Sequence, residues 1–279
     1  MPIGDSSVFK LFDSAEDVVE NRVTTISSGI WSSGGTTLQG TSTTAGFFTS
    51  SVQSASSGEY YYDVYQEATS SNTSEVQFSV AYGHYAGSGS KDPDTSNGKI
   101  SKAVYKQFKN LIVSPTNDYF KFGPTDAELE SSSSYFISVA RARMREKMDP
   151  GNWEIRLQSG STQNTLCLID DSGATSDSSV AKGTTYFNVV SGSIRSGTAD
   201  YEYSTGTTKM YYGRFYPFLG VVMLDSGRLD LGWEGITQKG ISIGTGLATN
   251  TDGNNASKLY QALSGSNGYF QARREEDIK

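Results

Sequence analysis

Hydroxyl-bearing residues and glycine dominate this sequence and constrain its fold more than any other feature. Ser and Thr, roughly 68 residues, together with 30 Gly make up about a third of the 279 positions. These residues are weak helix formers, whereas Thr suits strands and Ser and Gly suit turns. Aromatic residues reach 12%, enough to build a packed core. The composition therefore predicts a folded, mainly β protein with many short strands and turns.

The scarcity of ligating side chains and the charge balance exclude several classes of function. Cys167 is the one cysteine and His84 the one histidine, so we expect no internal disulfide and no cysteine-type or histidine-rich metal centre. The net charge of −7 argues against a nucleic-acid-binding face. No apolar run approaches the roughly 20 residues of a membrane-spanning helix. The N-terminus also lacks the basic start and apolar stretch of a signal peptide. We therefore expect no cofactor, no nucleic acid and no membrane insertion.

Alternating apolar and polar residues predict strands along most of the chain. In Glu75–Gly83, for example, the side chains of Val76, Phe78, Val80 and Tyr82 point to one side of the strand. The other predicted strands are Phe47–Gln53, Glu59–Gln66, Tyr135–Ala142, Trp153–Gln158, Thr165–Asp170, Thr184–Ile194, Lys209–Phe215 and the apolar run Pro217–Leu224. We expect them to form β-sandwich-like antiparallel sheets.

Two short helices and one turn complete the predicted elements. Apolar residues recur at helical spacing in Lys99–Ile112, which Pro115 terminates, and again in Asn254–Leu263. The sequence DPGN at Asp149–Asn152 is typical of a turn, and it is predicted to join the strands on either side of it.

The first 45 residues are predicted to form an extended N-terminal arm. Around Trp31 the sequence SSGIWSSGGTT consists of Gly and hydroxyl residues, as in flexible linkers and in arms that fold against a neighbour. A lone large aromatic residue in such a segment is a candidate anchor on a partner, although it could equally tuck onto its own domain. Residues 46–279 are predicted to form a β-rich structural domain, with a subdivision near 115–135 as an alternative.

The search for a catalytic constellation finds none that is specific. A Ser-His-Asp triad would need His84, which follows a predicted strand and lacks a nucleophile motif beside it. The segment Asp92–Gly98 resembles a calcium loop, but its glycine is misplaced and no glutamate closes it. Asp170 and Asp171 are expected to form a turn after a strand, with a glycosidase pair as the alternative. We therefore expect no catalytic residues and no enzyme activity.

One pattern of charge is notable in this acidic chain. Arg141, Arg143, Arg145 and Lys147 recur at every second residue, so they would form one cationic stripe if the strand continued through them. A row of guanidinium groups suits fork-like pairing with carboxylates on another protein. The alternatives are a solvated edge strand protected by charge, and contact with nucleic acid. Together with Trp31, these four residues are the predicted interface residues.

Four stretches carry a resemblance to a known family: EVQFSVAYGHYAGSGS, AVYKQFKNLIVSP, ISVARARMREKMDPGNWEIRL and GRFYPFLGVVMLD. Their succession resembles structural proteins of contractile-tailed phages, in particular baseplate and tail components of myophages that infect cyanobacteria. The matching stretches are spread from about Tyr60 to Gly268, and none of them is a catalytic motif. The resemblance implies a structural role in the virion tail, as a baseplate wedge component or its neighbour, for a protein made in the host cytoplasm.

The residues support the same expectation without the resemblance. A chain with few charges, many hydroxyls and an arm carrying one tryptophan suits a subunit that acts by fitting its neighbours. The expected partners are other tail or baseplate proteins and symmetry-related copies of the chain. Two other functions stay open. A receptor- or glycan-binding module would use exposed tyrosines of EYYYDVY and KMYYGRFY, and a hydrolase of the host envelope would use acidic pairs such as Asp170 and Asp171.

Overall fold

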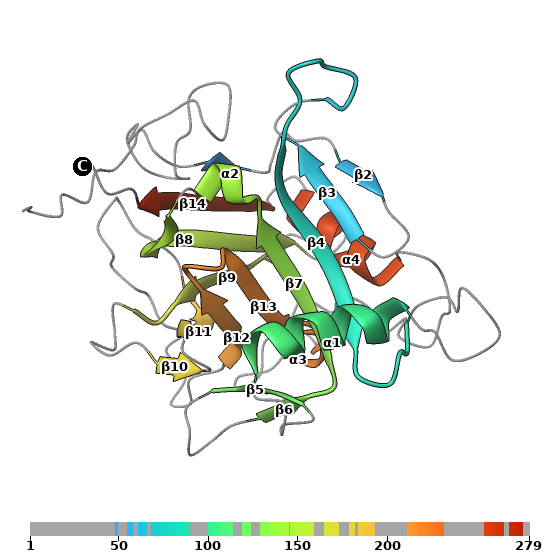
Figure 1. The fold of residues 1–279 in the computed structure, drawn as a ribbon, viewed down its shortest axis with the longest axis vertical. Coiled ribbons are helices and arrows are strands. Elements are labelled where there is room, and N and C mark those ends of the chain that lie inside the picture. Colours follow the sequence, from blue (N-terminus) through green and yellow to red (C-terminus); the bar gives the residue numbers. More distant parts are fainter. Residues whose placement is uncertain are drawn as a thin grey trace, which may run out of the picture.

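One antiparallel sheet forms the body of the protein in the computed structural model (Figure 1). The structure describes residues 48–49, 55–57, 61–65, 68–89, 100–113, 119–123, 129–144, 146–158, 165–172, 179–181, 184–192, 211–231, 254–264 and 268–275. The predicted arm with Trp31, the calcium-like segment Asp92–Gly98 and Arg145 lie outside these residues.

The strands of this sheet follow the order β1-β14-β8-β9-β11-β12-β13-β7-β4-β3-β2, and β10 pairs with β11. Every pairing is antiparallel, and the predicted mainly β class is confirmed. The strands are β1 (Phe48–Thr49), β2 (Ala55–Ser57), β3 (Tyr61–Tyr65), β4 (Val76–His84), β7 (Ser133–Val139), β8 (Lys147–Gln158), β9 (Thr165–Asp170), β10 (Ser179–Ala181), β11 (Thr184–Ser191), β12 (Tyr211–Tyr216), β13 (Val221–Asp225) and β14 (Tyr269–Glu275).

The sheet curls around helix α4 (Asn254–Ser264), one of the two predicted helices. Strands β1 and β2 stand at opposite ends of the strand order, although only five residues separate them in the sequence. Helix α4 contacts β14 and β8 near one end of the order and β4 and β3 near the other. Opposite regions of one sheet therefore face each other across the helix. Between them lies the larger core cluster, which includes Phe78, Tyr135, Trp153, Leu259 and Phe270.

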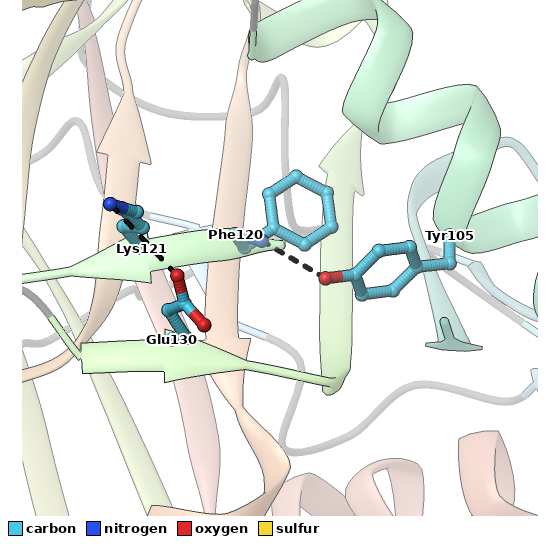
Figure 2. Close-up of polar contacts among 4 residues, drawn as sticks. All are labelled: Tyr105, Phe120, Lys121 and Glu130. Carbon is cyan, nitrogen blue, oxygen red and sulfur yellow. Dashed lines mark hydrogen bonds and ion pairs between the residues drawn. The ribbon is translucent and has the colours of Figure 1, made fainter. Parts of the chain in front are cut away.

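The second predicted helix, α1 (Ile100–Ile112), covers the other face of the sheet together with the hairpin of β5 (Phe120–Phe122) and β6 (Leu129–Ser131). Gly83 allows this close approach, because a Cβ atom there would lie 2.8 Å from the backbone nitrogen of Tyr105. The Tyr105 hydroxyl donates to the carbonyl oxygen of Ser131 at 2.6 Å and accepts from the backbone N–H of Phe120 at 3.0 Å. This fully buried side chain therefore ties the helix to both strands of the hairpin. Figure 2 shows the bond between Phe120 and the Tyr105 hydroxyl.

The predicted turn Asp149–Asn152 is wrong, because these residues lie inside the long strand β8. Strand β14 pairs with β8 on both sides of them, so four residues of β8 bulge out where β14 has one. One hydrogen bond lies within the bulge, from the side-chain amide of Asn152 to the carboxylate of Asp149 at 2.6 Å. Gly151 adopts a φ of 78° and its N–H donates to the buried carboxylate of Asp170 at 2.8 Å.

Between β7 and β8 the chain instead forms a short helix that was not predicted, α2 (Arg141–Met144). Strand β7 ends at Val139, so the strand predicted over Tyr135–Ala142 does not continue through the cationic residues, and they do not form the expected stripe. A similar break divides the apolar run Pro217–Leu224. Residues 217–220 form a tight turn, and the central strand β13 begins only at Val221. A further short helix, α3 (Ser226–Asp230), begins after its N-cap Asp225.

Candidate interaction surface

The tight turn Pro217–Gly220 between β12 and β13 is fixed by neighbours on both sides. The backbone N–H of Met148 donates to the carbonyl of Pro217 at 3.1 Å, and the N–H of Val139 donates to the carbonyl of Gly220 at 2.8 Å. The Arg141 guanidinium then donates to the carbonyl of Phe218 at 3.0 Å. Hydrogen bonds from β7, α2 and β8 therefore hold each part of the turn, so its conformation exists before any partner arrives.

Helix α2 sits directly against this turn because of one glycine. Gly220 has a φ of +64°, a left-handed conformation that favours glycine. A Cβ atom at this position would lie 2.4 Å from the sulfur of Met144, the last residue of α2. Met144 is fully buried there. The glycine thus permits both the bend of the turn and the packing of α2 beneath it.

Phe218 projects from the turn, and half of its side chain is exposed (50%). The ammonium of Lys147 lies 5.4 Å from the centre of its ring, within the range of a cation–π interaction. Arg141, bonded to the Phe218 carbonyl, is also exposed. We define the Phe218 surface as Phe218, Arg141 and Lys147: a rigidly held aromatic residue beside two cations.

Three of the five predicted interface residues, Arg141, Arg143 and Lys147, lie in the described part of the chain. Arg141 and Lys147 come together on the Phe218 surface, although through a helical turn rather than along a strand. Arg143 instead forms an ion pair with Glu75 and is largely buried. Burial lowers the pKa of this guanidinium from its ordinary value. Phe218 itself was missed by the sequence reasoning because it lies within an apolar run, and the signal that could have found it is the Pro-Phe-Leu-Gly turn sequence.

Within the described residues, Asp170 and Asp171 accept hydrogen bonds that stabilise the fold. The Asp170 carboxylate accepts hydrogen bonds from the N–H groups of Gly151 (2.8 Å) and Ser172 (3.0 Å). Asp171 accepts from the backbone and side-chain nitrogens of Asn188 on β11, at 2.9 and 3.0 Å. Burial raises the pKa of Asp170 to about 6, against the opposing effect of its hydrogen bonds. Both carboxylates are buried, and each already ties two elements together.

His84 does not have the geometry of a catalytic triad. Its Nδ1 atom accepts hydrogen bonds from the backbone N–H groups of Ala86 at 3.0 Å and Ser88 at 3.2 Å. A triad histidine donates from that nitrogen to a carboxylate, which an accepting Nδ1 cannot do. Among the described residues, no group of three or more His, Cys, Asp or Glu side chains is arranged to hold a metal ion.

A buried polar cluster lies on β8, β9 and β14. Glu154 accepts a hydrogen bond from the hydroxyl of Tyr269, and the guanidinium of Arg156 lies 5.6 Å from the centre of the Tyr269 ring. Cys167 lies beside this group. Burial, and then the nearby Glu154 carboxylate, raise the pKa of its thiol to about 11, so it stays protonated at neutral pH. The cluster therefore joins three strands rather than presenting a reactive thiolate.

Comparison of the chain with protein-family models, with curated proteins and with solved structures finds no match. In the part of the chain that the structure describes, no helix is long and apolar enough to cross a membrane.

Proposed function

We propose that this chain is a non-enzymatic structural subunit that acts through protein–protein contacts in a contractile phage tail, as a baseplate wedge component. The Phe218 surface is the observation that carries this proposal. The sequence resemblance to tail and baseplate proteins supplies the assembly in which such a contact would be made.

The Phe218 surface has the properties of an interface anchor. Aromatic and arginine side chains dominate the binding energy of many protein interfaces. Hydrogen bonds from Met148, Val139 and Arg141 already hold the turn, so little conformational entropy remains to be lost when it binds. An exposed aromatic residue on a turn whose backbone is held in place, with cations beside it, therefore suits attachment to a neighbouring protein.

The side chains considered as catalytic candidates, His84, Asp170 and Asp171, also support this proposal. His84 accepts two backbone hydrogen bonds, and Asp170 and Asp171 each bind two nitrogens of the fold. These side chains form hydrogen bonds that hold the structure together, which supports a structural role for them.

Quantitative mass spectrometry of purified phage particles, before and after the tails are stripped from the capsids, tests the proposal. We expect the chain to follow the tail fraction at a copy number that is a multiple of three or six. Particles carrying Phe218→Ala should assemble fewer tails than particles carrying Leu111→Ala, a control residue on α1 with the same exposed fraction of 50%. Absence of the chain from particles would refute the tail function.

Glycan binding is the second candidate, and one observation favours it. Tyr85 is 37% exposed, and its ring lies 4.6 Å from that of Tyr119. The tyrosines first considered for this role are less available, because Tyr212 and Tyr216 are buried and Tyr62 stacks on Tyr260 at 5.4 Å. Binding of the purified chain to a glycan panel, lost in Tyr85→Ala but kept in Phe218→Ala, would favour this function over the first.

A further inference from the structure

Helix α1 carries a row of three lysines. Lys102, Lys106 and Lys109 are spaced four and three residues apart, so they lie on one face of the helix, and we call them the lysine row. Lys106 is exposed, and the other two are partly exposed. The helix contains no carboxylate, so it has a net charge of +3 within a chain whose net charge is −7. Figure 1 shows α1 lying across the outside of the sheet, where the row is accessible to a partner.

The described residues do not neutralise the lysine row. None of the three lysines forms an ion pair with another described residue, and Glu130 of the adjoining hairpin pairs with Lys121 instead (Figure 2). The row is also unfavourable for the helix itself. Lysines three and four residues apart repel one another, and Lys102 lies in the first turn, where the helix dipole disfavours a cation. An arrangement that opposes local stability in this way points to an anion supplied from elsewhere.

The N-terminal arm contains the complementary pattern of charge. Asp13, Glu16, Asp17 and Glu20 have the spacing i, i+3, i+4 and i+7, which in a helix places four carboxylates on one face. The segment Asp13–Glu20 contains no cation and has a net charge of −4. No other window of eight residues in the sequence holds four carboxylates. The densest acidic segment of the chain therefore matches the lysine row in both length and sign.

The arm is long enough to bring this segment to α1. Residues 21–47, 27 in all, separate it from Phe48, where β1 begins. When extended they span up to about 90 Å at roughly 3.3 Å per residue. A compact chain of this length is only about 50 Å across. Because the segment is tethered, its concentration at α1 is effectively up to about millimolar, so that exposed ion pairs, each weak alone, are sufficient to hold it.

We propose that the acidic segment Asp13–Glu20 docks on the lysine row of α1 in the same chain. The contact pairs its carboxylates with Lys102, Lys106 and Lys109 and relieves the repulsion among these lysines. A separate acidic protein would lack the advantage of the tether. A nucleic acid would be repelled by the net charge of the whole chain. The contact is independent of the proposed function, because it does not involve the Phe218 surface.

Carbodiimide cross-linking of the purified full chain tests the contact, because this reagent joins a lysine amine to a carboxylate without a spacer. We expect mass spectrometry to find the lysine row joined to residues 13–20, in higher yield than Lys147, a partly exposed lysine on β8. The yield should fall as the salt concentration rises, because the paired charges are exposed. In an equal mixture of isotope-labelled and unlabelled chains, each cross-link should join two segments with the same label, as docking within one chain requires.

Charge reversal separates specific docking from general attraction. Lys106→Glu should lower the cross-linking of residues 13–20 to Lys102 and Lys109 about threefold or more, because one exposed ion pair becomes a like-charge contact. Lys147→Glu is the matched control: it changes the net charge equally and should leave this yield unchanged. Circular dichroism spectra that match the wild type would show that both variants fold.

Exchanging all the charges gives the decisive result. One variant combines lysine at the four acidic positions of the segment with glutamate at the three positions of the row: Asp13→Lys, Glu16→Lys, Asp17→Lys, Glu20→Lys, Lys102→Glu, Lys106→Glu and Lys109→Glu. Since opposite charges still face each other, we expect cross-links between residues 13–20 and α1 to persist with the donor and acceptor sides exchanged. Their loss in a folded variant would overturn the inference.

Three other results would also overturn it. Cross-links from the lysine row mainly to another carboxylate, such as Asp92 or Asp94, would show that a different segment neutralises the row. Cross-links between labelled and unlabelled chains would place the segment on a second copy. Binding of duplex DNA that Lys106→Glu abolishes, without cross-links to residues 13–20, would make a nucleic acid the occupant. None of these results bears on the tail function, which the mass spectrometry of phage particles tests separately.

Discussion

The hydroxyl of Tyr105 offers a quantitative test of how the outer layer is attached. It joins helix α1 to the β5–β6 hairpin through two buried hydrogen bonds, to Ser131 at 2.6 Å and from Phe120 at 3.0 Å. The second of these bonds is drawn in Figure 2. Tyr105→Phe removes one oxygen atom and leaves the ring in place against Phe120, whose ring centre is 4.6 Å away. The substitution therefore isolates the contribution of the hydroxyl from that of the packing.

The expected loss of stability follows from the two backbone groups that lose the Tyr105 hydroxyl as their hydrogen-bond partner. The Ser131 carbonyl and the Phe120 N–H would remain buried without this bond, and an unsatisfied buried group costs about 1–3 kcal/mol. We expect the free energy of unfolding to fall by about 3 kcal/mol in total. At about 2–4 °C per kcal/mol for a chain somewhat smaller than this one, the melting temperature should fall by roughly 6–12 °C.

Urea unfolding followed by tryptophan fluorescence and by far-ultraviolet circular dichroism measures this change. Burial raises the pKa of Tyr105 to about 12, so the hydroxyl stays a donor and the loss should be the same at pH 6 and pH 9. Tyr135→Phe is the matched control. Tyr135 is as buried as Tyr105. Burial raises the pKa of its hydroxyl, as do the nearby Tyr82 and Asp230, and no hydrogen bond is among the causes of this shift. We expect this control to cost under about 1 kcal/mol. Equal losses in the two variants would refute the reasoning.

Three further predictions concern other parts of the fold. The pKa of Asp170 is raised to about 6, above its unfolded value, so its neutral form favours folding and its contribution is lost as the pH rises through 6. As the pH falls from 7 to 4, the free energy of unfolding of the wild type should therefore rise by up to about 3 kcal/mol relative to that of Asp170→Asn, as measured by urea unfolding. Parallel pH profiles for the two proteins would contradict this. Gly220→Ala should destabilise the protein by about 2 kcal/mol, because its Cβ would meet Met144 and its φ is positive, and an unchanged melting temperature would argue against this packing. Cys167 should react with Ellman's reagent only after the chain unfolds, since burial raises its thiol pKa to about 11, and rapid labelling of the native protein would contradict this.

Side-chain periodicity predicted strands and helices well where the apolar face that it indicates is also the face buried in the core. Thr165–Asp170 is strand β9 with the predicted boundaries, and β4 and both predicted helices lie within a residue or so of their expected limits. These segments have a strong alternating or helical pattern, and their apolar faces are the ones buried in the two clusters. Packing then reinforces the local preference.

The errors arise where long-range pairing overrides local preference. The turn sequence DPGN lies within β8 because β14, more than a hundred residues away, pairs with β8 on both sides of it. The alternating cations from Arg141 look like a strand, yet α2 forms there because Met144 packs beneath Gly220 of a distant turn. Neither partner is visible in the local sequence.

The sequence by itself determined the fold class: a chain rich in hydroxyl residues and glycine is mainly β. It also determined that the protein is acidic, with a single cysteine and a single histidine. It also placed β4, β9, α1 and α4, because side-chain periodicity acts over a few residues. The tertiary structure alone decided that one sheet curls around α4, and that Arg141 and Lys147 meet at Phe218. Phe218 lies 77 residues from Arg141 and 71 from Lys147 in the chain. Only the packing of the β12–β13 turn against α2 and the ends of β7 and β8 brings them to one surface.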